Sequence, residues 1–491
     1  MKTSGVLHRI TEFAQHRFAG LLLASIAALS FLGPADDVPA AKLNVLFIVA
    51  DDLNNHLGCY GYDVQTPSID GLAKRGMRFD RAYCQVPLCN PSRVSFLSGL
   101  RPNKTQGYTL TTPARAHLGD WIMLPEYFRK NGYFTVQVGK IFHTGDGFED
   151  PRSWDVEIRE SGKQPLADQI VKRGETAGPA GLAIEWDWLA TADENTPDGI
   201  VASRAVGYME QAVADKKPFF LGVGFRRPHA PYAAPQKYFE LYPLEKIEPA
   251  DPAAKRHYAS LLPAAVNYPA TKTPMSDRER RQLIAAYYAC VSFMDAQVEV
   301  LLQSLERLGL RDNTVVVIIG DHGYHLGEHG GLWHKISLFE EAARVPMIIY
   351  APGMKAKGKT CERLVEMIDL YPTLVSLCDL PPRQGLDGID LSPLLDDPLQ
   401  PSKPAAYTVV ARSDDRTADH SRMMSYLGRS VRTERWRYSE WDGGKRGVEL
   451  YDHKGDPHEW TNLANTPQYA DTVRKLHEML SAGVVSATHS Q

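Results

Sequence analysis

Five short runs of Val, Ile, Phe and Leu recur along the chain, separated by stretches with the apolar spacing of helices. They are residues 43–50, 133–139, 218–225, 313–320 and 345–352. Short runs rich in these residues are typical of strands buried on both faces of a parallel sheet. The alternation of strand and helix patterns therefore predicts an α/β protein with a large sheet flanked by helices.

One helix is marked clearly at its start, in the stretch TPSIDGLAKRGMRF at residues 66–79. Thr66 suits an N-cap and Pro67 suits the first helical position, while apolar residues follow at helical spacing. After about Gln400 the strand and helix alternation stops. Shorter strand patterns follow at 405–411, 430–441 and 447–452, with a helix expected at 469–480. We therefore expect a large domain at 42–400 and a small α+β subdomain at 401–491.

Polar side chains that can bind ions or transfer protons follow four of the five apolar runs. They are Asp51 and Asp52, Lys140 and His143, His229, and Asp321 and His322. Each residue taken singly is compatible with a helix cap or a structural histidine. Because ligand sites in open α/β sheets gather at the carboxyl ends of strands, their joint placement favours one functional site.

Composition narrows the class of partner. The chain has 491 residues, 43% of them hydrophobic, and a formal charge of -4. It is long enough to bury a large core, and a nearly balanced charge gives no support for a nucleic-acid partner. Any affinity for an anion must therefore come from a local site.

The first 40 residues have the pattern of a secretory signal peptide. Lys2, Arg9 and Arg17 precede the apolar run 18–33, and small residues near Ala40 suit cleavage. The alternative is an uncleaved anchor, but the run is shorter than the roughly 20 residues that span a bilayer. We expect an exported, periplasmic or secreted bacterial protein without stable membrane insertion.

A single N-glycosylation sequon, at residues 103–105, makes a lysosomal location the less favoured one. The six cysteines could form three disulfides in an exported chain, but they lack the spacing of a dense framework. Cys290, inside the helical pattern at 284–305, is interpreted as a buried core thiol.

The most informative motif begins at Cys89. The sequence CNPSRVSFLSGLRP combines Cys-x-Pro-Ser-Arg with a helical pattern, and it resembles the signature of the type I, formylglycine-dependent sulfatases. The segments NVLFIVADDLN, VGKIFH, RRPHAPY and GDHGYHLGEHG also resemble this family, and within it the iduronate-2-sulfatases and their bacterial relatives. The resemblance extends over about residues 43–464.

This resemblance implies the alkaline-phosphatase-like fold, with a large mixed sheet, a catalytic domain at 42–400 and the smaller C-terminal subdomain. It also implies that a formylglycine-generating enzyme recognises Pro91 and Arg93 and oxidises Cys89 to Cα-formylglycine, which is hydrated to a gem-diol. A helix N-terminus favours an anionic ester there. Cys84 lacks a matching Pro and Arg downstream, so we interpret it as structural.

The resemblance further implies one divalent cation beside the modified Cys89, bound by Asp51, Asp52, Asp321 and His322. Three carboxylates suit Ca²⁺, which is the expected ion. An imidazole ligand suits Mn²⁺ or Zn²⁺ better, and these two ions are the alternatives.

Catalytic roles also follow from the resemblance. Arg93 is expected to brace the diol, Lys140 to hold diol and sulfate oxygens, and His143 to remove the second diol proton. His229 and Lys335 are placed on the leaving-group side, where one of them protonates the departing sugar oxygen.

Three further histidines, His325, His329 and His334, are expected to form loop structure or contact the substrate. The irregular pattern at 145–197 is typical of an insertion that shapes a pocket.

The expected substrate is a sulfated saccharide, a 2-O-sulfated uronic acid of a glycosaminoglycan or similar polysaccharide. Arg226 and Arg227 would bind its carboxylate, unless they are solvated loop charges or fold braces. The alternatives are a sulfatase for another sulfated sugar, a phosphate or phosphonate ester hydrolase of the same superfamily, and a non-catalytic protein that binds sulfated glycans.

Overall fold

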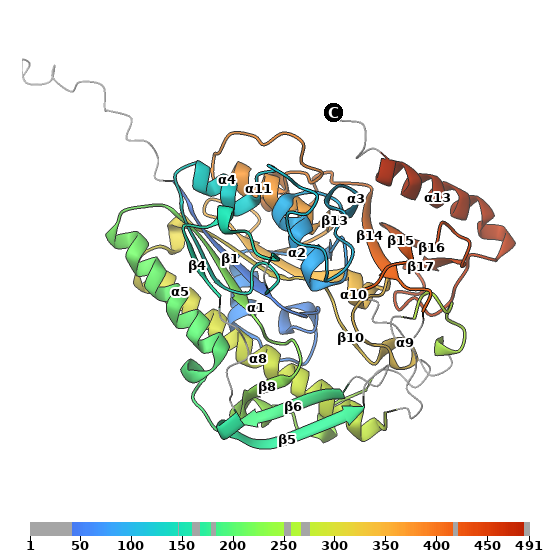
Figure 1. The fold of residues 1–491 in the computed structure, drawn as a ribbon, viewed down its shortest axis with the longest axis horizontal. Coiled ribbons are helices and arrows are strands. Elements are labelled where there is room, and N and C mark those ends of the chain that lie inside the picture. The colour runs from blue at the N-terminus through green and yellow to red at the C-terminus, as the bar shows by residue number, and fades with distance from the viewer. Residues whose placement is uncertain are drawn as a thin grey trace, which may run out of the picture. The chain divides into compact units, whose positions relative to one another are not determined.

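An eight-stranded mixed sheet lies at the centre of the fold (Figure 1). Its strands, in spatial order, are β13 (Lys359–Glu366), β2 (Met77–Tyr83), β12 (Arg344–Tyr350), β9 (Thr314–Gly320), β1 (Asn44–Ala50), β7 (Phe219–Phe225), β3 (Phe134–Gly139) and β4 (Val156–Ile158). All seven residues of β1 are buried, as expected for a strand covered on both faces. The predicted α/β class with a large mixed sheet is therefore confirmed.

The computed structural model describes residues 42–145, 147–159, 167–177, 183–249, 257–266, 275–415 and 421–485. The expected signal peptide at 1–40 lies outside these residues. No helix in the described ranges is long and apolar enough to cross a membrane.

Strands β9, β1, β7 and β3 run parallel, so that Phe47 pairs with Val317 on one side and Gly222 on the other. The prediction of parallel strands is wrong for β12, which runs antiparallel to both β9 and β2. The elements between β9 and β12 are all short: the two-residue strands β10 (His325–Leu326) and β11 (Trp333–His334) and the helices α9 (Glu328–Gly331) and α10 (Glu340–Ala343). Without a crossover helix, the chain re-enters the sheet from the end at which β9 leaves it.

Helices cover both faces of the sheet (Figure 1). On one face, α8 (Asp277–Arg307) packs against α5 (Pro197–Ala214) and α1 (Pro67–Arg75). On the other face lie α2 (Cys89–Ser98), α4 (Leu124–Lys130) and α11 (Leu370–Leu377), and every residue of α2 is buried.

The start of α1 agrees with the prediction of Thr66 as N-cap and Pro67 as the first residue. The Thr66 hydroxyl does not cap the helix, however. The carboxylate of Asp295 on α8 accepts hydrogen bonds from the amides of Ser68 and Ile69 instead. A side chain more than two hundred positions away thus caps α1, which local sequence could not indicate.

The insertion at 145–197 is more regular than its sequence indicates. Strands β5 (Ile170–Ala177) and β6 (Ala183–Leu189) pair antiparallel, and β6 continues a three-stranded sheet with β8 (Tyr232–Pro235). β5 carries charged residues in the sequence IVKRGETA, so its hydrophobic pattern is too weak to identify it as a strand.

A separate four-stranded sheet follows near the C-terminus. It contains β14 (Ala405–Arg412), β15 (Tyr426–Thr433), β16 (Trp436–Trp441) and β17 (Val448–Asp452), and α13 (Ala470–Val485) packs on it. The predicted single strand at 430–441 is wrong, because the chain turns at 434–435 and forms the β15–β16 hairpin. The sheet begins close to residue 400, and a domain boundary there stays a prediction.

The remaining elements are short. They are α3 (Pro102–Thr105), α6 (Gln236–Phe239), α12 (Ser392–Asp396), β10 (His325–Leu326) and β11 (Trp333–His334), with 3-10 turns at Gly58–Tyr60, Pro151–Ser153, Ala167–Gln169, Asp193–Asn195, Leu244–Lys246, Arg311–Asn313, Met367–Asp369 and Pro467–Tyr469. All six cysteines lie in the described ranges as free thiols. Cys84 and Cys290 are fully buried, as expected for structural cysteines.

Candidate active site

The carboxyl ends of β1 and β9 deliver two pairs of polar residues to one point. Asp51 and Asp52 follow β1, and Asp321 and His322 follow β9. The backbone amide of Asp321 donates to the carbonyl of Ala50 at 3.1 Å, and the amide of Asp52 donates to Oδ1 of Asp321 at 3.0 Å. The parallel pairing of the two strands thus extends into the loops and fixes the carboxylates relative to one another.

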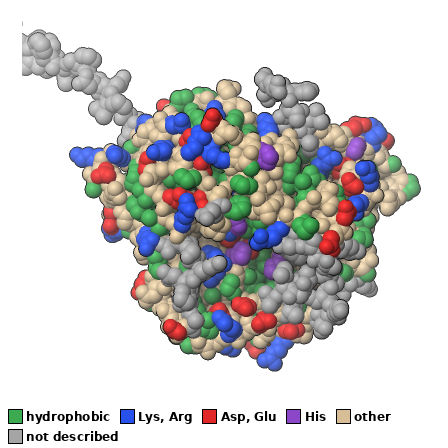
Figure 2. All heavy atoms as spheres, viewed as in Figure 1, with side chains coloured by type: hydrophobic (Ala, Val, Ile, Leu, Met, Phe, Trp, Pro, Cys, Tyr) green, Lys and Arg blue, Asp and Glu red, His purple; other side chains and the backbone are tan. Residues whose placement is uncertain are grey.

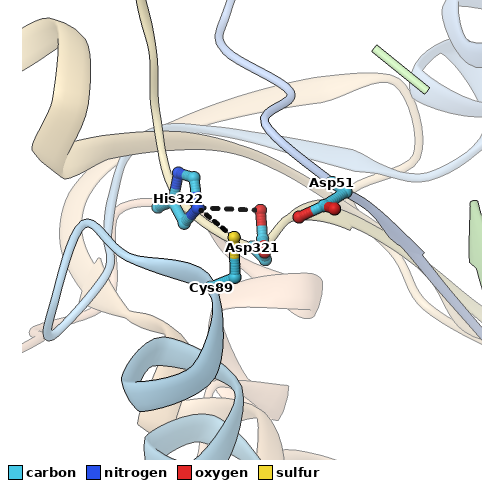
Figure 3. A group of neighbouring side chains, drawn as sticks. All are labelled: Asp51, Cys89, Asp321 and His322. Atoms are coloured by element: carbon cyan, nitrogen blue, oxygen red, sulfur yellow. Dashed lines mark hydrogen bonds and ion pairs between the residues drawn. The ribbon is translucent and has the colours of Figure 1, made fainter. Parts of the chain in front are cut away.

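Cys89 enters this point from the other side of the site, as the first residue of α2. Figure 3 shows its thiol directed toward His322, with Asp51 and Asp321 beside it. The distance from Sγ to Nε2 of His322 is 3.4 Å. The donor atoms of Asp51, Cys89, Asp321 and His322 all lie within 4.8 Å of one another.

A second, overlapping group contains Asp52, Cys89 and His229, again with donor atoms within 4.8 Å of one another. Oδ1 of Asp52 lies 3.4 Å from Nε2 of His322, so the two groups form one cluster around Cys89. Three buried carboxylates and one imidazole in such proximity form a donor set that fits a divalent cation.

Arg93 lies one turn into α2 and is completely buried. Its Nε donates to Oδ2 of Asp321 at 2.9 Å, and its Nη2 lies 3.4 Å from Oδ1 of Asp51. Its Nη1 donates to the carbonyl oxygens of Lys140 and Ile141, just after β3. Arg93 therefore braces the carboxylates and the β3 loop, and none of these hydrogen bonds goes to Cys89.

Two lysines reach the cluster from different loops. Nζ of Lys140 lies 2.5 Å from Oδ2 of Asp51. Nζ of Lys335 donates to Oδ1 of Asp52 and, at 3.0 Å, to Sγ of Cys89. Of these two lysines, Lys335 is therefore the one that touches the residue expected to be modified.

The backbone around Lys335 is strained. His334 and Ile336 have φ of 67° and 65°, a left-handed conformation that is unfavourable for a β-branched residue such as Ile336. The amide of Ile336 donates to the carbonyl of Pro87 at 3.1 Å, and its carbonyl accepts from Nη2 of Arg412 at 2.9 Å. These contacts hold Lys335 against the start of α2.

Charges in the cluster are set by burial and by mutual proximity. Burial alone would raise the pKa of Asp51, but Lys140, His229 and Arg93 together hold it well below the usual value. Burial would also raise the pKa of Asp52, yet Lys335 lowers it to about 2. Burial raises the pKa of the Cys89 thiol to about 12, so the unmodified thiol is protonated at neutral pH.

The two histidines predicted to be catalytic, His143 and His229, are neutral at pH 7. Burial lowers the pKa of His143 to about 3 and that of His229 to about 4. Nδ1 of His229 lies 2.6 Å from the carbonyl of Ala230, and Nε2 lies 3.8 Å from Oδ2 of Asp52. Nδ1 of His143 is buried and has no hydrogen-bond partner among the described residues. No hydrogen bond joins His143 to Cys89 in the described part of the chain.

The two arginines after β7 differ. Arg227 is buried and donates to the carbonyl oxygens of Ala233 and His229 at 2.7 and 2.8 Å, so it braces the loop. Nε of Arg226 is buried and has no hydrogen-bond partner among the residues that the structure describes. Of these two arginines, Arg226 is therefore the candidate for binding an anion.

Tyr287 belongs to the site although its sequence context indicates only a helix core. Its hydroxyl donates to the carbonyl of Asp52 at 2.7 Å and accepts from the amide of Asn54 at 2.9 Å. Asp52 itself has φ of 63°. Tyr287 thus stabilises the left-handed turn that directs Asp52 into the cluster, and no local signal in α8 could have indicated it.

The face shown in Figure 2 is hollowed near its centre, where histidine side chains gather beside Lys and Arg side chains. Histidine, Lys and Arg side chains beside a hollow suit an anionic ligand.

Known proteins are similar to this chain in sequence and in fold. Residues 43–380 match the family model described as Sulfatase, and residues 327–485 match the model described as N-sulphoglucosamine sulphohydrolase, C-terminal. The chain is 32% identical over 537 residues to iduronate 2-sulfatase of Homo sapiens, covering 93% of this chain and 97% of that protein. It is 32% identical over 462 residues to a sulfatase of Formosa agariphila, covering 89% and 86%.

Among solved structures, the phosphonate monoester hydrolase of Agrobacterium radiobacter superposes with a TM-score of 0.76 at 23% identity. The match covers 91% of this chain and 96% of the other. At this identity the likeness concerns the fold alone.

Proposed function

Since the chain belongs to the sulfatase family, whose members hydrolyse sulfate esters, we propose that it removes the 2-O-sulfate of a uronic acid by means of a formylglycine made from Cys89. The observation that carries this proposal is the convergence on Cys89 of three carboxylates, His322 and Lys335. Together these groups can supply the nucleophile, the cation ligands and a hydrogen-bond donor that hydrolysis of a sulfate ester requires.

Two features of Cys89 fit a formylglycine. It opens a buried helix inside the motif Cys-x-Pro-Ser-Arg, which resembles the signal for the modifying enzyme. A buried thiol with a pKa of about 12 is also a poor nucleophile at neutral pH. Formylglycine would supply a hydrated aldehyde whose hydroxyl oxygen attacks sulfur, and Sγ of Cys89 stands in for an oxygen of that group.

The donor set fits one divalent cation, with Asp51, Asp52, Asp321 and His322 as the residues that would hold it. Three carboxylates favour Ca²⁺ as the resident ion. When bound, such a cation offsets negative charge on the sulfate oxygens, so that a nucleophile can approach the sulfur. Arg93 keeps two of these carboxylates in place through its buried ion pairs.

The protonation states support a division of roles. His143 is neutral, and its Nδ1 is unpartnered among the described residues, so it suits a proton acceptor. Burial would lower the pKa of Lys335, but the adjacent carboxylate of Asp52 raises it well above the usual value. Lys335 therefore stays a charged ammonium group, which suits it to donate a hydrogen bond to the negative charge that develops on the departing sugar oxygen. His229 and Lys140 would position substrate oxygens.

The proposed sugar rests on two supports. The relative from Homo sapiens is named iduronate 2-sulfatase, and the chain matches nearly all of it at 32% identity. Arg226 has a buried and unpartnered Nε among the described residues, and a guanidinium suits a carboxylate such as that of a uronic acid. Another sulfated sugar is the alternative, since the same hydrolytic cluster serves any sulfate ester.

A desulfation screen tests the proposal. The enzyme, made together with a formylglycine-generating enzyme, is given a 2-O-sulfated uronyl disaccharide, 6-O-sulfated N-acetylglucosamine and a phosphonate monoester. We expect the uronyl disaccharide to show the highest kcat/KM. Preference for the neutral sugar would overturn the sugar assignment and leave the sulfatase activity, whereas preference for the phosphonate would overturn both mechanism and substrate.

We also propose that residues 1–40 direct export and are removed. The N-terminal sequence of protein recovered from the periplasm or the medium tests this. A mature chain that begins near Ala41 is expected, and an intact Met1 in exported protein would contradict cleavage.

A further inference from the structure

A second cluster of possible metal ligands lies outside the group around Cys89. The donor atoms of His325, His329 and Glu341 lie within 4.8 Å of one another. Both histidines are buried, and the Glu341 side chain is half-buried. The three residues come from β10, α9 and α10, which all belong to the segment between β9 and β12.

Their separations suit tetrahedral coordination. Nε2 of His329 lies 2.9 Å from Oε2 of Glu341, and Nδ1 of His325 lies 4.0 Å from the same oxygen. Oε2 of Glu328 lies 3.6 Å from Nδ1 of His325. Zinc bonds of about 2.0–2.1 Å place tetrahedral ligand atoms about 3.4 Å apart, and the observed distances fall on both sides of that value.

Each imidazole directs one ring nitrogen toward the cluster, while its other ring nitrogen contacts a neighbouring side chain. Nε2 of His325 is hydrogen-bonded to Oγ of Ser337 at 2.7 Å, while its buried Nδ1 has no hydrogen-bond partner among the described residues. Nδ1 of His329 faces Nδ1 of His257 at 3.1 Å, which leaves its Nε2 for Glu341. Metal-binding histidines are typically held in this way, through the ring nitrogen that does not bind the metal.

We propose that His325, His329 and Glu341 form a second divalent cation site of the zinc class, with the fourth position open to water. Two imidazole nitrogens with a carboxylate oxygen favour Zn²⁺ over Ca²⁺, in contrast to the carboxylate-rich cluster around Cys89. A cation there also provides a partner for the buried Nδ1 of His325, which otherwise faces two carboxylates. The inference does not depend on the sugar that the enzyme prefers.

An entry path for the ion exists. A cavity of about 640 Å³ is lined by His329 and Glu341, and also by Glu328, His56 and His458 among others. His458 is exposed and belongs to none of the clusters of possible metal ligands among the described residues. It therefore offers a matched control for a histidine that lines the same cavity without binding the ion.

The position of this cation site suggests that it helps to hold Lys335 beside Cys89. The segment from His325 to Glu341 contains Lys335, whose Nζ contacts Sγ of Cys89. His325 also pairs with His334, the neighbour of Lys335, through the β10–β11 ladder. A cation bound to His325, His329 and Glu341 would tie both ends of this segment together and so position Lys335.

Zinc content tests the site on the full-length protein. The protein is equilibrated with Zn²⁺ in an excess of Ca²⁺, desalted and analysed by mass spectrometry of the elements. We expect one equivalent of zinc in the wild type, in His458→Ala and in Asp321→Asn, whose first cluster is weakened. We expect that equivalent to be lost in His325→Ala and in Glu341→Gln. Unchanged zinc in both of these variants, or no zinc in the wild type, would overturn the proposal.

X-ray absorption on the zinc-loaded wild type keeps the test decisive if a buried variant fails to fold. Two imidazoles with oxygen ligands are expected in the first coordination shell, and a shell with fewer than two imidazoles would contradict the site.

Hydrogen exchange tests whether the cation positions the segment that carries Lys335. Zinc should slow exchange of amides in residues 325–341 in the wild type and leave it unchanged in His325→Ala, and equal exchange with and without zinc in the wild type would contradict the role in positioning Lys335.

Discussion

Nζ of Lys335 donates a hydrogen bond to Sγ of Cys89 at 3.0 Å, although 246 positions separate the two residues in the chain. The start of α2 and the loop that carries Lys335 meet because the amide of Ile336 donates to the carbonyl of Pro87. The ammonium group is thus fixed at the residue proposed to become the nucleophile.

Replacing Lys335 tests this contact. Lys335→Ala should lower kcat by about 10²–10³-fold, the range for loss of one hydrogen-bond donor to charge that develops in the transition state, with a smaller change in KM. Steady-state kinetics on the uronyl disaccharide measures the effect. Lys355→Ala, which removes an exposed lysine paired with Asp396, is the control and should leave kcat unchanged. An unaltered kcat in Lys335→Ala would remove Lys335 from the mechanism.

Cys89 and Cys84 should behave differently although both are buried. Cys89→Ala should abolish turnover, because no formylglycine can form. Cys84→Ala should keep turnover and lower the free energy of unfolding by about 1 kcal/mol, because only a small buried group is lost. Peptide mass spectrometry should find formylglycine at position 89 in active protein, and active protein with only unmodified Cys89 would refute the proposed nucleophile.

Asp321→Asn should lose activity and bind Ca²⁺ more weakly while retaining the fold. The amide has nearly the same shape, but it lacks the charge that holds both the cation and Arg93. Calcium content and circular dichroism measure the two effects. Asp295→Asn is the control, since this buried carboxyl caps α1 and should affect stability without changing bound calcium. Full calcium content with normal activity in Asp321→Asn would argue against the proposed ligand set.

Arg226 and Arg227 should separate substrate recognition from stability. Arg226→Ala should raise KM for the 2-O-sulfated uronyl substrate about 10–100-fold, the value of a hydrogen bond to a charged group, and should not affect a neutral sulfated sugar. Arg227→Ala should instead lower the melting temperature, because its guanidinium bridges two loop carbonyls. Equal changes in KM for both substrates would show that Arg226 does not bind the carboxylate of the uronic acid.

Acid should destabilise the protein through His56, which is half-buried. Burial lowers the pKa of His56 to about 4, from an ordinary value near 6.5. Between these pH values the unfolded chain binds a proton at His56 that the folded chain does not, so the free energy of unfolding decreases as pH falls.

His56→Gln should therefore flatten the dependence of the urea midpoint on pH between about 6.5 and 4. The exposed His458 provides the control, and His458→Gln should follow the wild-type curve. If His56→Gln keeps the full wild-type pH dependence, the burial of His56 is not what makes the protein sensitive to acid.

Much of the fold could be predicted from local sequence. The runs that form β1, β7 and β9 are almost entirely apolar because both faces of these strands are covered, and such a pattern is visible without tertiary contacts. The residues after them gather at one edge because parallel strands share a carboxyl end. The motif at Cys89 identified the start of α2 in the same local way.

Other features depend on how distant segments return to the sheet. The antiparallel direction of β12 follows from the route of residues 321–343, and the β5–β6 hairpin has too polar a pattern to be recognised. The sequence presents Arg226 and Arg227 as equivalent neighbours, and only the folded loop uses Arg227 as a brace and leaves Nε of Arg226 unpartnered among the described residues. Whether a side chain contacts a partner hundreds of positions away is decided by packing, since no local pattern records which loop will lie beside it.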